Sequence, residues 1–490
     1  MAGGVLAGHA SSAVAADWRH CLPFPVDPRP APSCAAGTGV LWYTADFDRW
    51  VAGYNLSELN EWPLFLVGLG VVGSATARLL TERSDFLASR AGVRFVIHGA
   101  AVADVHKVRP GLTPSFPLSN DPWQGIRDPA VRVVVELMGG TTMALDVVTA
   151  ALRAGKHVVT ANKALLAEHG EALFRLAREH GCLLAFEAAV AGSIPVIQAV
   201  RDGLAANTID VLVGIINGTA NFVLSRMRSG QLSFQEALQE ARRLGYAEQD
   251  TALDVDGLDA AHKLALLARV AMGVPLRANV VHTETISQVT QEDMAFAEAL
   301  GYCIRQLAIA RKTACGIELR VHPALVRRQH LLAHVDGVMN AVLVHGDIAG
   351  DNLYYGTGAG GDATASAVLA DLIALGRQTT GWAALRLPEP AEELPILPMG
   401  QIKSAYYLRM RVTDSPGVMA SLTAIMAEHA INVEAIIQKE PSCDDGHVPL
   451  VFLTAVVPES SLQAALQRMQ ALETVLGTIQ CIRLAPLETL

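Results

Sequence analysis

Asp259 and Lys263 are charged residues in a segment that is otherwise almost entirely apolar. Their spacing places both side chains on one face of a helix. Leucine and alanine fill nearly all positions from 258 to 267, as on a buried helix. Because buried charges are costly unless they pair or meet a charged ligand, this pattern indicates either an ion pair between helical neighbours or a site for a zwitterionic amino acid.

Acidic residues concentrate just before this helix. The segment from 245 to 259 contains Glu248, Asp250, Asp254 and Asp256. Carboxylates can face the ammonium group of an amino acid while a lysine faces its oxygen atoms. The segment therefore favours a small amino-acid substrate.

Lys163 follows a short apolar segment, His157 to Thr160, that we interpret as a strand. Open α/β sheets bind ligands at the carboxyl ends of their strands. A lysine there can hold a charge against a substrate and exchange a proton with a hydroxyl group. The alternative is a solvated lysine in the first turn of a helix. Because the helix dipole prefers anions at that end, a functional role is favoured.

A glycine turn, Gly68-Leu69-Gly70-Val71-Val72-Gly73, stands between a strand-length apolar run and the start of a helix. In a dinucleotide-binding turn, such glycines permit a tight bend and let backbone N–H groups approach the pyrophosphate. Asp104 ends the next predicted strand, where a ribose-binding group is expected, and its distance from Gly73 predicts a long intervening helix. The alternative is a turn whose glycines serve packing alone.

Glu187 ends another predicted strand, and small residues follow it as far as Gly192. Carbonyl oxygens of such irregular backbone can bind a hard cation. A carboxylate that caps a turn is an equal alternative.

An alternating order of strands and helices must position these residues. We expect strands over 64–69, 93–103, 132–137, 157–160 and 182–187, with helices over 74–80, 144–154 and 164–180. Continuous apolar strands separated by helices indicate a parallel sheet buried on both faces. The fold class is therefore α/β and begins with a Rossmann-type nucleotide-binding domain.

Two further regions follow this sheet. The middle third contains a predicted strand over 209–216, helices after Ser233 and Gly257, strand alternation over 316–345 and a helix over 364–377. We expect an α+β domain here, for which the resemblance described below implies a role in catalysis and dimerisation. Prolines cluster between 386 and 400, which indicates a linker. Residues 404–483 then have the order strand, helix, strand, strand, helix, strand of a ferredoxin-like unit.

The composition excludes several classes of protein. A formal net charge of -10 argues against a nucleic-acid partner, because phosphate contacts need clustered lysine and arginine. Glycine, proline and charged residues interrupt every window long enough for a membrane helix, so no membrane partner is expected. Seven cysteines without a Cys-x-x-Cys pair indicate neither a zinc site nor a disulfide framework and fit a cytoplasmic location.

The motifs and their order resemble those of the homoserine dehydrogenase family from about Leu64 to Arg377, followed by an ACT domain. The segments that carry the resemblance are GLGVVG, VVVELMGG, GKHVVTANKALLAEHG, FEAAVAGSIPVI, IINGTANFVLSRM, GYAEQDTALDVDGLDAAHKLALLA and YYGTGAGGDATASAVLADL. The turn from Asp414 to Val418 resembles the ACT signature, in which a glycine turn admits a small amino-acid effector. The resemblance implies NAD- or NADP-dependent interconversion of L-homoserine and L-aspartate 4-semialdehyde in threonine, methionine and isoleucine biosynthesis.

The resemblance also implies roles for particular residues. The catalytic residues would be Lys163, Lys263 and Asp259. The substrate-binding residues would be Asn217, Gly218, Thr219, Tyr246, Glu248 and Asp254. The cofactor would contact Gly68, Leu69, Gly70, Val71, Val72, Gly73, Asp104, Gly139, Gly140, Lys163 and Gly358. A monovalent cation, sodium or potassium, would be held by Glu187, Val190 and Gly192.

Three positions depart from the family pattern. Val71 replaces a common threonine and Thr251 a common proline, and neither change touches the chemistry. Val105 stands where an arginine often follows the aspartate. Because a 2'-phosphate needs a cation, and Lys107 and Arg109 are the basic residues that remain nearby, the choice between NAD and NADP stays open.

Two alternative functions remain. One is another dehydrogenase for a related small amino or hydroxy acid, and the other is a catalytically silent amino-acid sensor of the ACT type. The resemblance suggests threonine as the effector of the ACT domain, and a homo-oligomer is expected because exposed sheet edges often pair.

The expected domains follow from these patterns. They are a flexible N-terminal extension (1–62), a Rossmann domain (63–190), a catalytic domain (191–385), a linker (386–403) and an ACT regulatory domain (404–486). The Pro-rich linker predicts that the ACT domain can be removed without loss of dehydrogenase activity.

Overall fold

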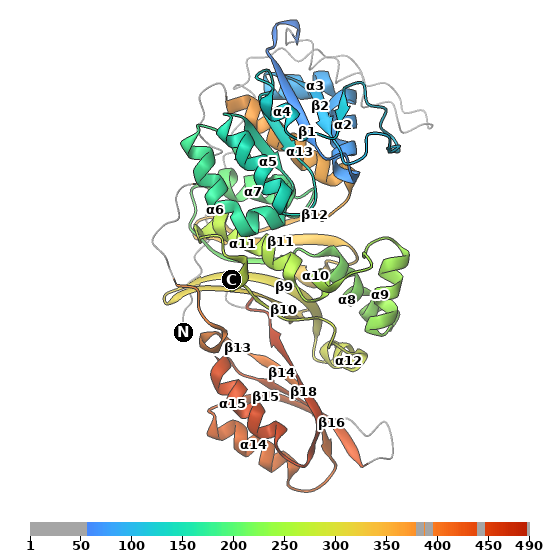
Figure 1. Cartoon of the computed structure of the whole chain (residues 1–490). Coiled ribbons are helices and arrows are strands. Elements are labelled where there is room, and N and C mark those ends of the chain that lie inside the picture. Colours follow the sequence, from blue (N-terminus) through green and yellow to red (C-terminus); the bar gives the residue numbers. More distant parts are fainter. Residues whose placement is uncertain (1–55, 379–386, 388–394, 439–445, 488–490) are drawn as a thin grey trace, which may run out of the picture. The chain divides into compact units, whose positions relative to one another are not determined.

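A computed structural model describes residues 56–378, 387, 395–438 and 446–487 of the chain (Figure 1). Residues 1–55 of the predicted N-terminal extension and residues 388–394 of the predicted linker lie outside the described residues. Within the described part of the extension, a short 3-10 helix, η2 (Leu56–Glu58), precedes a strand that begins at Glu61.

The first sheet is fully parallel and has the order β3-β2-β1-β4-β5-β6. Its strands are β1 (Glu61–Val67), β2 (Arg94–Ala101), β3 (Leu118–Ser119), β4 (Val133–Glu136), β5 (His157–Thr160) and β6 (Leu184–Ala185). The connecting helices are α2 (Val71–Glu82), α3 (Ser84–Ala91), α4 (Gln124–Arg127), α5 (Thr142–Arg153) and α6 (Lys163–Glu179). The predicted Rossmann-type sheet is confirmed.

Apolar residues on both faces explain why this sheet is central. Val133 and Val135 of β4 pack with α2 and α3, whereas Val134 packs with α5 and α6, as the period-2 geometry of a strand requires. All three valines are fully buried. Helices therefore cover both faces of the sheet.

The connection between Gly73 and Asp104 differs from the prediction. Two helices, α2 and α3, occupy the interval where one long helix was expected. Arg83 separates them, and Gly92 ends α3 in the left-handed conformation. The second helix accounts for the unusual spacing.

Helix α13 (Gly361–Gln378) belongs to the same layer as α2 and α3 although it begins 270 residues after the end of α3 at Ala91, beyond the strands of the second sheet's catalytic region. Val368, Leu372 and Leu375 on α13 share a buried cluster with Leu80 and other residues of the first sheet's helices. Figure 1 shows this orange helix among the blue elements. The nucleotide-binding layer is therefore completed by the end of the catalytic region.

The second sheet has ten strands and contains both the catalytic and the ACT strands. Its catalytic strands are β7 (Ile209–Ile215), β8 (His282–Thr283), β9 (Tyr302–Thr313), β10 (Gly316–Arg327), β11 (Met339–Gly346) and β12 (Gly350–Thr357). The helices that accompany them are α8 (Gly218–Gly230), α9 (Phe234–Arg243), α10 (Ala252–Val255), α11 (Leu258–Met272) and α12 (Gln291–Ala299). Helix α11 packs against α6 in one buried cluster, which brings the catalytic helix to the nucleotide-binding layer.

The predicted ferredoxin-like unit is confirmed. It consists of β14 (Tyr406–Thr413), α14 (Val418–Glu428), β15 (Val433–Gln438), β16 (His447–Thr454), α15 (Glu459–Gln470) and β18 (Val475–Leu484), with the strand order β18-β14-β16-β15. Strands β13 (Lys403–Ser404) and β17 (Val457–Pro458) form a separate two-stranded antiparallel sheet. These elements are red in Figure 1.

The ACT domain is not an independent unit in this structure. Strand β18 pairs with β10, and Tyr407 and Ile482 share a hydrophobic cluster with Phe296 of α12. Arg409 of β14 lies 2.6 Å from the buried carboxylate of Asp293 at the start of α12. Removal of the domain would expose an apolar surface and a buried charge, so we expect truncation to lower the stability of the enzyme; its effect on activity stays a prediction.

No helix among the described residues is long and apolar enough to cross a membrane.

Candidate active site

A cavity of about 600 Å³ collects residues from four distant parts of the chain. Its lining includes every predicted catalytic and substrate-binding residue: Lys163, Asn217, Gly218, Thr219, Tyr246, Glu248, Asp254, Asp259, Lys263, together with Gly358. The remaining lining residues are Gly245, Asp250, Leu253, Val338, Thr357, Ala359 and Gly360. The structure therefore brings together residues that are up to 197 positions apart, from Lys163 to Gly360.

Asp259 lies between the two lysines. One carboxylate oxygen is 3.2 Å from Lys163 Nζ, and the other is 2.8 Å from Lys263 Nζ. Lys263 also donates to the carbonyl oxygen of Ile216 at 2.8 Å. Two cations that share one carboxylate leave an excess positive charge facing the cavity, which suits an oxygen atom that gains negative charge during a reaction.

Lys163 and Lys263 differ in exposure. The Lys263 side chain is 12% exposed and the Lys163 side chain 38%. Lys163 is the first residue of α6, directly after the end of β5, and Lys263 lies one turn beyond Asp259 on α11. Lys163 is therefore the lysine with more access to a bound ligand.

Asn217 connects the acids of the cavity. Its side-chain amide donates to Asp254 at 2.7 Å and to Asp259 at 2.9 Å. Its side-chain oxygen accepts from the backbone N–H of Ala220 and so caps α8. The residue that begins α8 thus also orients both carboxylates.

The two carboxyl groups have opposite pKa shifts. Burial raises the pKa of Asp254, and the hydrogen bond from Asn217 offsets only part of this effect. Burial opposes ionisation of Asp259 too, but Lys263 and Lys163 outweigh it and hold the pKa of that carboxyl well below its usual range. Asp259 is therefore ionised throughout the neutral range.

The opposite wall of the cavity is more open. Tyr246 is 45% exposed, and its backbone oxygen accepts from the Thr219 hydroxyl at 2.7 Å. Glu248 and Asp250 are also exposed. Both oxygens of Asp259 already face lysines, so we expect the exposed carboxylates of this wall, rather than Asp259, to face a substrate ammonium group.

The glycine turn fits a dinucleotide phosphate. A side chain at Gly68 would come within 2.6 Å of the Leu137 carbonyl oxygen, and one at Gly73 within 2.1 Å of the Gly68 carbonyl oxygen. At Gly70, which caps α2, the same position has no atom within 4 Å. Two glycines therefore serve packing, and the third leaves the N-terminus of α2 open to an anion.

Asp104 lies in an exposed turn after β2. Its carboxylate accepts from the backbone N–H of His106 at 2.8 Å. Arg109 donates to the carbonyl oxygens of Asp104 and Lys107, so its guanidinium is held against the turn itself. Lys107 is exposed beside it.

A hydrogen-bond network that the sequence analysis missed lies behind Lys163. The fully buried Glu136 accepts from the Thr160 hydroxyl at 2.5 Å and from the Met138 N–H at 2.9 Å. Asn162 donates to the carbonyl oxygen of Gly140 at 2.7 Å and caps α6. Burial raises the pKa of Glu136 to about 7, against these hydrogen bonds. The sequence feature that could have indicated this network is the single acidic residue at the end of a strand that otherwise consists of valines.

Glu187 lies in a 3-10 helix, η3 (Glu187–Ala189), and not at the end of a strand, because β6 stops at Ala185. Its carboxylate accepts from the backbone N–H groups of Ile197 and Gln198, both at 2.8 Å, in the short helix α7 (Val196–Gln198). The turn-capping alternative therefore describes this side chain. Burial raises the pKa of Glu187 to about 7.

Val190 and Gly192 follow in the same irregular segment. Gly192 adopts a φ of 58°, and a side chain there would come within 2.5 Å of the Gly358 carbonyl oxygen. Any cation would accordingly be held by main-chain oxygens, since the Glu187 carboxylate is already engaged.

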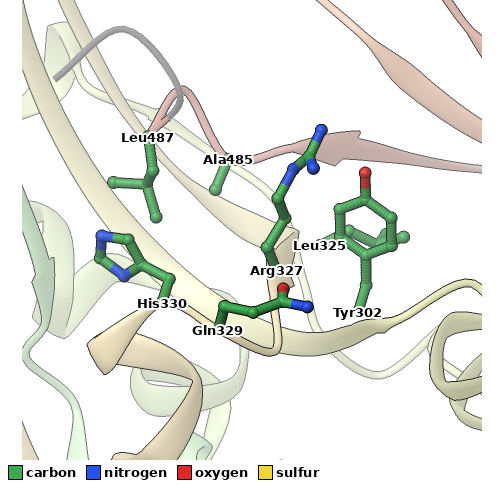
Figure 2. Close-up of a pocket in the computed structure, with 7 residues that line it drawn as sticks. All are labelled: Tyr302, Leu325, Arg327, Gln329, His330, Ala485 and Leu487. Carbon is green, nitrogen blue, oxygen red and sulfur yellow. The ribbon is translucent and has the colours of Figure 1, made fainter.

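A second cavity of about 420 Å³ differs in chemistry. Figure 2 shows its lining by Tyr302, Leu325, Arg327, Gln329, His330, Ala485 and Leu487. It contains no carboxylate and no lysine among these residues. It therefore lacks the charged groups that the first cavity offers to an amino acid.

The parallel sheet, the open glycine turn and the cavity lined by two lysines and four acids together define a nicotinamide-dependent oxidoreductase that acts on a small amino acid.

Comparison with known proteins identifies the family. The family model for the homoserine dehydrogenase NAD-binding domain matches residues 68–187, that for homoserine dehydrogenase matches 195–373, and that for the ACT domain matches 406–474. The homoserine dehydrogenase of Pseudomonas aeruginosa is 47% identical over 431 residues, which cover 86% of this chain and 98% of that protein. That of Bacillus subtilis is 36% identical and covers 84% and 95%.

Solved structures agree. A homoserine dehydrogenase from Thiobacillus denitrificans has a TM-score of 0.83 and 45% identity, and the match covers 87% of this chain and 99% of that one. The enzyme from Staphylococcus aureus has a TM-score of 0.70 and 30% identity, with 88% and 100% covered. The chain belongs to the homoserine dehydrogenase family and catalyses the NAD(P)-dependent interconversion of L-homoserine and L-aspartate 4-semialdehyde. Its catalytic regions are intact, which disfavours a silent sensor.

Proposed function

We propose that Lys163, Lys263 and Asp259 carry the chemistry of homoserine oxidation. The observation that supports this most strongly is the arrangement of both lysines around one ionised carboxylate in the wall of the cavity. In the oxidative direction the substrate hydroxyl loses its proton towards Lys163, directly or through water. A bound nicotinamide would accept a hydride from the substrate carbon that carries this hydroxyl.

In the reductive direction the two lysines stabilise the charge that grows on the aldehyde oxygen. Asp259 keeps both ammonium groups directed at this point and prevents their mutual repulsion from separating them. Its partner Asn217 holds the carboxylate in place.

Substrate binding is assigned to the more open wall. The carboxylates of Glu248 and Asp254 would face the ammonium group of homoserine, and the exposure of Glu248 in the cavity lining supports this. Asn217, Gly218 and Thr219 at the start of α8, with Tyr246, would border the rest of the substrate.

Cofactor binding is assigned to the carboxyl end of the first sheet. Gly68 to Gly73 would hold the pyrophosphate, Asp104 the ribose, and Gly139, Gly140, Lys163 and Gly358 would border the nicotinamide half. Lys107 is the exposed cation nearest in sequence to Asp104 that could meet a 2'-phosphate, and comparison of NAD with NADP in the same assay decides between them.

Substitution of each lysine tests the catalytic assignment. Lys163→Ala and Lys263→Ala should each reduce turnover by at least about 100-fold, because a positioned group for proton transfer or charge stabilisation contributes about that much. Cofactor affinity, measured by fluorescence titration, should change little in Lys263→Ala, because Lys263 is not among the residues assigned to the cofactor. Near-normal turnover in either variant removes that lysine from the mechanism.

A monovalent cation, sodium or potassium, is proposed at the carbonyl oxygens of Val190 and Gly192, next to Glu187. The left-handed backbone at Gly192 and its close approach to Gly358 support a role in the geometry of the cavity. Assays in which sodium or potassium replaces a bulky organic cation test this assignment. Equal rates in all three salts would exclude it.

The ACT domain is proposed to bind threonine beside the turn from Asp414 to Val418. Gly417, with a φ of 96°, begins α14 at this turn and leaves room for a small ligand. An effector can act only if it binds one catalytic state better than another. Inhibition by millimolar threonine that Asp414→Ala abolishes would support the site, and equal inhibition of both proteins would exclude it.

A homo-oligomer and a cytoplasmic location are also proposed. Strands β12 and β15 end the ten-stranded sheet without a further neighbour among the described residues, and such edges invite pairing with another copy. The described cysteines Cys182, Cys303, Cys315 and Cys481 are free thiols, as in a reducing compartment. Light scattering at several protein concentrations tests the oligomer.

A further inference from the structure

Glu136 is a fully buried acid at the point where three functional turns meet. It is the last residue of β4, which lies between β1 and β5 in the sheet. Strand β1 leads into the glycine turn, β4 into Gly139 and Gly140, and β5 into Lys163. The groups that contact the carboxylate are neutral, so its burial is not explained by an ion pair.

One oxygen of Glu136 controls the turn that carries Lys163. The Thr160 hydroxyl donates to this oxygen at 2.5 Å and accepts in turn from the backbone N–H of Asn162 at 2.9 Å. The side-chain oxygen of Asn162 accepts from the N–H of Leu165 at 3.0 Å and begins the helix. The orientation of Lys163 at the start of α6 therefore depends on a chain of hydrogen bonds that starts at Glu136.

The other oxygen controls the turn on the cofactor side. It accepts from the N–H of Met138 at 2.9 Å, next to the Leu137 carbonyl against which Gly68 packs. Asn162 closes the connection by donating to the Gly140 carbonyl at 2.7 Å. A single carboxylate thus ties the glycine-containing turn after β4 to the lysine turn after β5.

We propose that Glu136 is a positioning residue for the reaction, which sets Lys163 against the reacting carbon of the cofactor and substrate by bridging the turns after β4 and β5. The proposal rests on the proposed catalytic role of Lys163. Glu136 itself does not line the cavity and acts through Thr160 and Asn162.

The chemistry of the side chain explains why glutamate is needed. Two donors converge on the two carboxylate oxygens, and a carboxylate accepts at both. A glutamine offers one oxygen only, and its amide group could reach the Thr160 hydroxyl only as a donor, which leaves the hydroxyl proton without its present acceptor. Glu136→Gln therefore keeps the size of the side chain but replaces the short bond from Thr160 to a carboxylate oxygen with a weaker one of the opposite direction.

The experiment compares turnover and Michaelis constants in Glu136→Gln. We expect turnover to fall about 10- to 100-fold, because a misplaced reacting group costs that much, while the Michaelis constants for homoserine and cofactor change less than about threefold. Thr160→Val, which removes the hydroxyl and keeps the shape, should show the same pattern if the glutamine variant folds poorly. Unchanged turnover in a folded Thr160→Val or Glu136→Gln overturns the proposal.

Glu171→Gln is the matched control. Glu171 lies on the same helix as Lys163 and also accepts two hydrogen bonds, from Arg269 at 2.8 Å and from the Leu276 N–H at 3.0 Å, but it lies outside the cavity lining. Its loss should lower thermal stability and leave turnover close to that of the wild type. A fall in turnover as large as in Glu136→Gln would mean that Glu136 acts through general stability, which overturns the proposal.

A double-mutant cycle separates this proposal from the role of Lys163. If Glu136 acts through Lys163, Glu136→Gln should cause less than about a threefold further loss in a Lys163→Ala background. A full further loss means that Glu136 acts elsewhere and overturns the proposal while leaving the role of Lys163 intact. Normal turnover of Lys163→Ala alone overturns the catalytic role of the lysine, and the proposal with it.

Discussion

Asp259 has one partner that the sequence predicts and one that it does not. Its place on an apolar helix predicted a charged partner, and four positions of spacing pointed to Lys263. The contact with Lys163, which lies 96 positions earlier, could not be read from any local pattern. Because the two lysines occupy this carboxylate, we expect other acids to bind the substrate ammonium group.

The proposed role of Glu248 in binding the homoserine ammonium group can be tested by substitution. Glu248→Gln should raise the Michaelis constant for homoserine about 10-fold, because a charge-assisted hydrogen bond contributes roughly 1.5–3 kcal/mol. The Michaelis constant for the cofactor should stay within about twofold, which steady-state kinetics with each substrate varied in turn will show. Equal losses for both would indicate a folding defect and argue against the assignment.

Among the elements, the strands of the first sheet were predicted well because valine runs and glycine turns encode them locally. Strand β5 matches its prediction at both ends, from His157 to Thr160. The helix at the end of the catalytic region was also expected, but its periodicity could not reveal that it packs beside α2. Glu136 and Asp371 were missed because a lone acid in an apolar element carries no signal of its partner.

Asp371 makes the packing of α13 dependent on pH. It is buried, and its carboxyl accepts from the backbone N–H of Glu187 at 2.8 Å. Burial and the nearby Glu187 raise the pKa of Asp371 well above its ordinary value, and burial raises that of Glu187 to about 7. The stability that these protonated acids contribute is present below their unfolded pKa values and is lost as the pH rises through the folded ones.

The free energy of unfolding should therefore fall between about pH 5 and about pH 8, and Asp371→Asn should reduce this fall. Asparagine cannot ionise, and its side-chain oxygen can still accept from Glu187. Urea unfolding at a series of pH values measures the effect. Glu428→Gln changes an exposed acid in the ACT domain and serves as the control. Its free energy of unfolding should fall with pH as that of the wild type does. An unchanged decline in Asp371→Asn would exclude the buried acid as its source.

At the scale of the whole molecule, the ACT and catalytic parts share one sheet and one core. Besides the contact of Arg409 with Asp293, Arg483 of β18 joins the ACT part to Glu284 of the catalytic part at 2.7 Å. Proline content predicts a linker but could not show that the chain returns to the catalytic sheet through β18. The order of domains was thus accessible from sequence, and their mutual dependence was not.

Truncation before Pro398 should consequently destabilise the enzyme. It would expose Phe296 and Leu325, which are buried beside Tyr407 and Ile482, and would leave Asp293 without Arg409. We expect aggregation or a melting temperature lower by at least about 5 °C in differential scanning fluorimetry. Arg409→Ala in the full chain should cause a smaller decrease in the same direction. A truncated protein as stable and active as the full chain would show that the shared core contributes little.

The most direct test of the central claim is the rate at which the full-length protein reduces NAD or NADP in the presence of L-homoserine, followed by the absorbance of the reduced nicotinamide. The structure predicts homoserine-dependent reduction with at least one of the two cofactors. It also predicts a kcat/KM at least about 10-fold lower for L-serine, which is shorter by one methylene group and cannot place its hydroxyl at Lys163 while its ammonium group stays on the acidic wall. Absence of reduction with both cofactors, or equal rates with serine and homoserine, would contradict the assignment of this cavity.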